Sequence, residues 1–238
     1  MHTMHLGVIG VLVAYGLWAL IEGDVWGLAG GCTAEAGHAR SALQLRRELQ
    51  HWYNQEAREH PDRPVYRLTV FSLKTLGPRD APSLKGPKAA ETGSLLRFTT
   101  TLLKEHCGAL QKGPALLACS EALVQYLDIT RSAGPRLKPA QLQALVTATL
   151  RFLSLRNDAG LPFTPKMHLM LHLVHQSSRL GNPLYVATWA DEGLNRDFAK
   201  VCASAHSFVW SKRVLATMNH DAGPLAKAAR SEKAANGV

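Results

Sequence analysis

Three histidines stand at helical spacing in the C-terminal third of the chain. His168, His172 and His175 are related as i, i+4 and i+7, so they project from one stripe of the helix predicted there. Two such histidines can clasp a zinc ion, and the further ligands that zinc needs could come from Cys202 and His206, which have the same four-residue spacing. The alternative is that these histidines lie at the edge of the core and hydrogen-bond to backbone or carboxylate groups.

A pair of carboxylates follows the histidines. Asp191 and Glu192 fall in the first turn of a helix predicted over residues 189–205. Carboxylates at that place are stabilised by the unsatisfied backbone N–H groups of the first turn, so simple capping would explain them. The other interpretation is that Glu192, with Asp191 beside it, binds a divalent cation, because Mg²⁺ and Mn²⁺ prefer carboxylate oxygens.

Two familiar classes of zinc protein are excluded. Leu169 follows His168 at the place where the zinc-peptidase pattern has a glutamate. The cysteines show no Cys-x-x-Cys spacing and no dense framework, so the sequence encodes neither a zinc ribbon nor a disulfide scaffold. They are Cys32, Cys107, Cys119 and Cys202. A free-standing zinc-dependent hydrolase built on the histidine stripe remains one hypothesis.

The elements that would hold these residues are almost all helical. An amphipathic pattern over residues 32–59 predicts a helix that is ended by Pro61 and Pro64. Further helices are predicted at 91–107, 114–131, 139–156, 165–180, 189–205 and 207–219. Prolines at the first helical position mark three of the starts, at Pro114, Pro139 and Pro165, and Thr164 is expected to cap the last of them. The expected stop residues are Gly108, Gly134, Gly160 and Gly181.

The remaining segments are a loop, one ambiguous stretch and a tail. Residues 77–90 are rich in proline and glycine and predict a loop, whereas residues 65–73 are compatible with a short strand or with a continuing helix. Residues 220–238 carry almost no large apolar side chain and predict a disordered basic tail. The expected fold is mainly α, an irregular helical bundle over residues 1–219 with at most one short strand.

An apolar segment lies near the N-terminus. Leu6 to Ile21 contains no charged residue, but it is shorter than the roughly 20 residues that a membrane-spanning helix needs. No Lys or Arg precedes Arg40, so the basic flank typical of a membrane anchor or a signal peptide is missing. The apolar helix within residues 1–24 is therefore either a buried core helix or a membrane anchor.

Two sets of motifs carry a resemblance to a known family. The first runs from Pro165-Lys-Met-His168 and His172 through Gly181 and Pro183 to Glu192-x-x-Asn195-x-x-x-x-Lys200, and the second is Met1-His2-Thr-Met-His5-Leu-Gly-Val8. Together they resemble the C-terminal region of Plavaka-like eukaryotic cut-and-paste transposases, which are related to the Kyakuja, Dileera and Zisupton group. The middle of the chain adds only its helical character and the stretch Leu84-Lys-Gly-Pro-Lys-Ala-Ala-Glu91.

The resemblance implies a fold and an active site that this chain holds only in part. Such transposases have a ribonuclease-H-like core with two aspartates and a glutamate, and a helical insertion before the glutamate. By position Glu192 matches that glutamate, whereas the aspartates would lie upstream of Met1, since no Asp precedes Asp24. Mg²⁺ or Mn²⁺ would bind only if the complete site were present. The expectation is the helical insertion and C-terminal end of a DDE transposase, truncated and unable to cleave DNA alone.

The charge favours an anionic partner. Twenty-seven Lys and Arg against eighteen Asp and Glu give a formal net charge of +9, and the sequence pI is about 9.6. If the partner is DNA, the residues expected to face it are Lys166, Arg179, Arg196, Lys200, Lys212 and Arg213, although such charges are also common on solvated faces. A transposase-derived protein, with an upstream transposase core as a further partner, would be nuclear. The alternative is a small membrane-anchored helical protein without a catalytic role.

Overall fold

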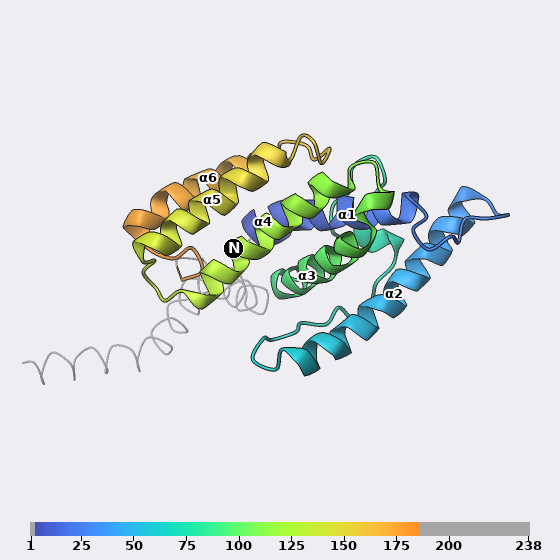
Figure 1. Cartoon of the computed structure of the whole chain (residues 1–238), viewed down its shortest axis with the longest axis horizontal. Coiled ribbons are helices and arrows are strands. Elements are labelled where there is room, and N and C mark those ends of the chain that lie inside the picture. The colour runs from blue at the N-terminus through green and yellow to red at the C-terminus, as the bar shows by residue number, and fades with distance from the viewer. Residues whose placement is uncertain (1–2, 186–238) are drawn as a thin grey trace, which may run out of the picture. The chain divides into compact units, whose positions relative to one another are not determined.

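Every regular element in the described part of the chain, residues 3–185, is helical in the computed structural model (Figure 1). A π-helical segment leads into the first α-helix, and two short 3₁₀ turns separate some of the others. The elements are η1 (Thr3–Ile9), α1 (Gly10–Glu22), α2 (Ala34–Glu59), η2 (Leu73–Leu76), α3 (Ala89–His106), η3 (Cys107–Ala109), α4 (Gly113–Ser132), α5 (Pro139–Leu155) and α6 (Pro165–Leu180). Residues 3–185 contain no strand, so the predicted mainly α bundle is confirmed.

The apolar segment forms the centre of this bundle. Leu12, Val13 and Leu17 of α1 are completely buried, and α1 packs against α2, α3 and α4. Gly16 permits a close approach to α3, because a Cβ there would lie 2.9 Å from Thr99 Cγ2. Met4–Glu22 is long and apolar enough to cross a membrane, yet 78% of its apolar window is buried among other helices. This burial favours the core-helix alternative.

The predicted helix starts agree with the structure, apart from one cap. Helices α5 and α6 begin at Pro139 and Pro165, and Pro114 is the second residue of α4. Thr164 is the N-cap residue of α6, as predicted, but its side chain accepts no backbone hydrogen bond, and the Thr164 carbonyl accepts the Met167 amide at 2.9 Å. The Thr164 hydroxyl is left buried without a partner among the described residues.

The ambiguous stretch at residues 65–73 is neither strand nor continuing helix. Its backbone amides are satisfied by side chains of the bundle: the Tyr66 amide donates to Ser94 Oγ of α3, and the Leu68 amide donates to the Tyr53 hydroxyl of α2, both at 3.0 Å. Because these donors already have partners, they need no paired strand, and at Leu73 the segment passes into η2. The predicted loop at 77–90 is present, but α3 begins at Ala89, inside its last two residues.

Candidate functional site

The histidine stripe lies on the solvent face of α6. His168, His172 and His175 are all exposed, and the Nε2 atoms of His168 and His172 are 2.8 Å apart, with the rings edge to face. These side chains therefore do not sit at the core edge, and the first two contact each other. Within residues 3–185, no group of three His, Cys, Asp or Glu side chains could hold a metal ion. The pair by itself supplies two of the three or four protein ligands that zinc sites use.

Most of the other predicted site residues lie outside the described residues. These are Asp191, Glu192, Arg196, Lys200, Cys202, His206, Lys212 and Arg213, together with the predicted helices 189–205 and 207–219 and the tail. Lys166 and Arg179 are described, and both are exposed on α6.

The glycine and asparagine after α6 fix the end of that helix to the rest of the bundle. The completely buried Asn182 donates from Nδ2 to the carbonyls of Thr130, Ala133 and Gly134, at 2.8, 3.2 and 3.2 Å. Gly181 has φ +92°, and a Cβ on it would lie 2.4 Å from the Pro135 carbonyl oxygen. This part of the motif thus clamps α6 onto the turn between α4 and α5, a role that the sequence did not indicate for Asn182.

The N-terminal motif and the described part of the C-terminal motif lie side by side. Element η1, from the N-terminal motif, packs against α6, from the C-terminal one. At their contact the Lys166 side chain covers Gly7 so closely that a Cβ on Gly7 would lie 2.2 Å from Lys166 Cδ and 3.0 Å from Lys166 Cβ. The glycine of Leu-Gly-Val and the lysine of Pro-Lys-Met-His therefore form one packing unit, although they are far apart in the sequence.

The helical pair α5 and α6 and its connections are strongly basic. Residues 133–185 contain six Lys and Arg side chains and a single carboxylate, Asp158. The two helices pack against each other and run side by side in Figure 1. Five of the basic side chains are exposed, namely Arg136, Lys138, Arg151, Lys166 and Arg179. A surface of this composition attracts anions.

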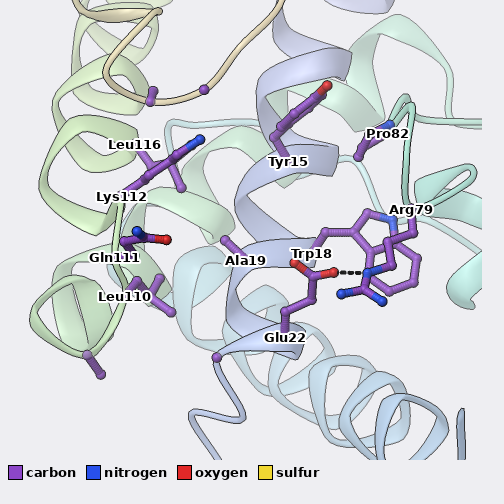
Figure 2. A pocket seen from close by; sticks show the side chains of 14 residues that line it. Tyr15, Trp18, Ala19, Glu22, Arg79, Pro82, Leu110, Gln111, Lys112 and Leu116 are labelled. Atoms are coloured by element: carbon purple, nitrogen blue, oxygen red, sulfur yellow. Dashed lines mark hydrogen bonds and ion pairs between the residues drawn. The ribbon is translucent and has the colours of Figure 1, made fainter. Parts of the chain in front are cut away.

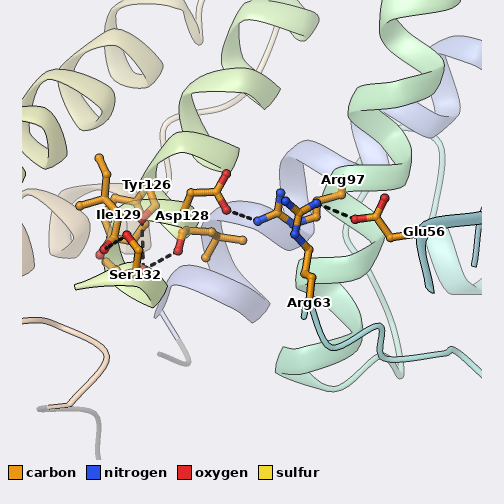
Figure 3. A network of polar contacts seen from close by, with 9 residues as sticks. Glu56, Arg63, Arg97, Tyr126, Asp128, Ile129 and Ser132 are labelled. Carbon is orange, nitrogen blue, oxygen red and sulfur yellow. Dashed lines mark hydrogen bonds and ion pairs between the residues drawn. The ribbon is translucent and has the colours of Figure 1, made fainter. Parts of the chain in front are cut away.

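A network of arginines and carboxylates joins three parts of the bundle (Figure 3). Arg63, in the segment after α2, pairs with Glu56 at 2.6 Å, and Arg97 of α3 pairs with Asp128 of α4. Figure 3 shows the two ion pairs lying between α2, α3 and α4. The Arg97 Nε has no partner among the described residues. No sequence signal pointed to this network, since its members are dispersed along the chain and belong to no motif.

Arg131 and His5 extend the positive side of this network. Burial lowers the pKa of Arg131, and the nearby charge of Arg97 lowers it further. His5 is 2% exposed, and burial, followed by the charge of Arg131, lowers its pKa to about 4. Gly93 provides the room, because a Cβ there would lie 2.9 Å from Arg131 Nη2 and 3.5 Å from His5 Cε1.

A separate cavity of about 390 Å³ opens beside α1 (Figure 2). Trp18 forms part of its wall and donates from Nε1 to the Gly77 carbonyl at 3.3 Å. Glu22 of α1 and Arg79 of the loop after η2 form an ion pair at its rim, and the Lys112 side chain lies across Gly160 on the other side. None of the residues predicted from the sequence to form a site lines this cavity.

Comparison of the chain with protein-family models, with curated proteins and with solved structures found no match. The resemblance to Plavaka-like transposases therefore rests on the sequence motifs.

Proposed function

We propose that the chain is a helical part of a DDE transposase-like protein, which binds DNA but does not cleave it alone. The observation that carries this proposal is the contact of Gly7 with Lys166, which brings the two family-like motifs together. In an RNase-H-like site, residues from distant segments must meet around the metal ions. Neighbouring motifs are what such a site requires.

DNA is the partner that the charge distribution supports. The exposed basic side chains of the α5 and α6 region outnumber its carboxylates, and Lys166 and Arg179 extend this character over α6. Lysine and arginine contacts to phosphates supply most of the sequence-independent affinity for DNA. Cleavage, in contrast, needs several carboxylates around two cations, and the motifs assign only Glu192 to this chain.

Incubation with supercoiled plasmid in Mg²⁺ or Mn²⁺ tests the lack of cleavage. We expect retarded plasmid without nicking. Nicking by the wild-type chain that disappears in Glu192→Gln would contradict the proposal.

The encoding DNA upstream of the Met1 codon provides an independent test. We expect an in-frame aspartate codon there, followed directly by the codons of the Met-His motif, within a pattern typical of RNase-H-like strands. A promoter and an in-frame stop codon at that place would count against a transposase origin.

The second candidate function is a membrane-anchored helical protein, and the observation that favours it is the 19-residue apolar helix Met4–Glu22. This function requires the helices that cover α1 to release it. Flotation of the full chain with phospholipid vesicles at high salt tests it, because electrostatic binding to lipid is screened there. Flotation that is lost when residues 1–24 are deleted would support an anchor, and a chain that remains in the dense fraction would exclude it.

A further inference from the structure

We infer that Arg63, Arg97 and Arg131 form a binding site for a phosphate group. The three arginines come from three segments of the bundle: the stretch after α2, helix α3 and helix α4. Both Arg97 and Arg63 lie near enough to Arg131 for their charges to act on it. Like charges that converge repel one another, so a bound anion among them would be stabilised.

The carboxylates present do not balance this site. Glu56 pairs with Arg63, and Asp128 pairs with Arg97 while its charge also acts on Arg131, so two carboxylates serve three arginines. Among residues 3–185, Arg131 forms no ion pair and no side-chain hydrogen bond, although it is half-buried and its pKa is lowered mainly by that burial. Guanidinium groups taken out of water need a partner, because an unpaired buried charge costs several kcal/mol. One positive charge is therefore left over where water is partly excluded.

The buried neighbour of Arg131 points to the same conclusion. Both ring nitrogens of His5 are buried, and neither makes a hydrogen bond of good geometry with the described residues, although the Ala89 backbone lies close enough to act on the ring. The ring lies beside Arg131 at Gly93. A neutral imidazole can donate one N–H bond to an oxyanion. Arg97 Nε, also buried and without a partner, is a second donor left over in the same network.

The site is open to a ligand from outside. The side chain of Arg63 is 35% exposed and that of Asp128 is 49% exposed, so one side of the network faces solvent. Guanidinium groups match the tetrahedral oxygens of phosphate with paired N–H donors, which a chloride ion does not exploit. If the proposed function holds, and this step rests on it, the phosphate belongs to a DNA backbone; a free phosphate ligand is the other source.

Thermal unfolding of the full chain with added inorganic phosphate, at constant ionic strength in sodium chloride, tests the site. We expect the melting temperature of the wild-type chain to rise by about 4 °C at ten times the dissociation constant. Arg131→Gln should remove this rise. The same variant should melt no lower than wild type in chloride alone, because it removes a charge without a partner. If Arg131 had only a structural role, its replacement would lower the melting temperature in chloride.

Arg136→Gln is the matched control, because Arg136 is exposed and lies five residues further along the chain. It should retain the full phosphate response. Equal responses of both variants and wild type, or no response in any, would overturn the inference.

DNA binding measured on the same proteins separates the two sources of the phosphate. A larger loss of DNA affinity in Arg131→Gln than in Arg136→Gln assigns the site to DNA phosphate, and equal losses assign it to a free phosphate ligand. Wild-type chain that responds to phosphate but binds no DNA would contradict the proposed function alone.

Discussion

His5 makes the stability of the protein depend on pH. Its pKa falls from an unperturbed 6.5 to about 4 in the folded state, mainly through burial and secondly through Arg131. The unfolded chain therefore binds more protons between these two values, and the free energy of unfolding decreases as pH falls from about 6.5 to about 4. The full contribution is about 3 kcal/mol. Urea unfolding at a series of pH values should show this decrease in wild type and a smaller one in His5→Leu.

The control for this experiment is His51→Leu, which replaces an exposed histidine of α2. It should keep the wild-type pH dependence. An identical pH dependence in His5→Leu and wild type would show that His5 is not held neutral.

Asn182 is the second residue with a large expected effect. Asn182→Ala removes four hydrogen bonds, three donated by Nδ2 and one accepted by Oδ1 from the Leu184 amide, and it leaves carbonyls of the α4–α5 turn without that donor. We expect a loss of about 2–3 kcal/mol in the free energy of unfolding. Asn157→Ala, at an exposed position, should cost less than about 0.5 kcal/mol. Equal and small losses in both variants would contradict the clamp.

The adjacent Nε2 atoms of His168 and His172 predict that Zn²⁺ binds this pair. Isothermal titration should show binding that His172→Ala abolishes, that His175→Ala retains and that a chelator reverses. Loss of binding in His175→Ala to the same extent would contradict a two-histidine clasp.

Residues that repeat at helical spacing were predictable from the sequence, and residues joined only by the fold were not. The His168 and His172 pair follows from the four-residue period of a helix. Arg63, Arg97 and Arg131 are each 34 residues from the next, and only the packing of separate segments brings their charges together. Asn182 stood next to two noted residues, but its role depends on a turn that precedes α5.

Gly7 and Lys166 should be energetically coupled, because η1 packs against α6 through them. Gly7→Ala places a Cβ against the lysine side chain and should cost about 1 kcal/mol. The same substitution in a Lys166→Ala background should cost much less, since the obstructing atoms are gone. A double-mutant cycle with urea unfolding measures the coupling, for which we expect at least about 0.5 kcal/mol. Strictly additive effects would contradict the contact.

Helix positions were predicted well wherever a local signal marks an end. Pro139 and Pro165 set the starts of α5 and α6, since proline suits the first turn of a helix. Residues 65–73 could not be assigned, because the partners of their amides, Ser94 and Tyr53, come from other helices. Their β-branched and aromatic composition was compatible with a strand but gave no information about backbone pairing.

For the molecule as a whole, the sequence left open whether the N-terminal apolar helix is a core helix or a membrane anchor. An apolar helix of this length is compatible with a core or a membrane, because both are apolar surroundings. The described residues provide a core: α2, α3 and α4 surround α1, and Leu12, Val13 and Leu17 are fully buried. The polar surface around α5 and α6 is strongly basic, which is the property that DNA binding would use.

The salt dependence of DNA binding tests the proposed function most directly. Fluorescence anisotropy with a short labelled duplex should show affinity that falls steeply between about 50 and 200 mM salt. Lys166→Gln and Arg179→Gln should each lower the slope of log affinity against log salt by about one, whereas Arg40→Gln on α2 should leave it unchanged. Absence of salt-dependent binding by the wild-type chain, or an equal change in all three variants, would contradict a DNA-binding surface on α6.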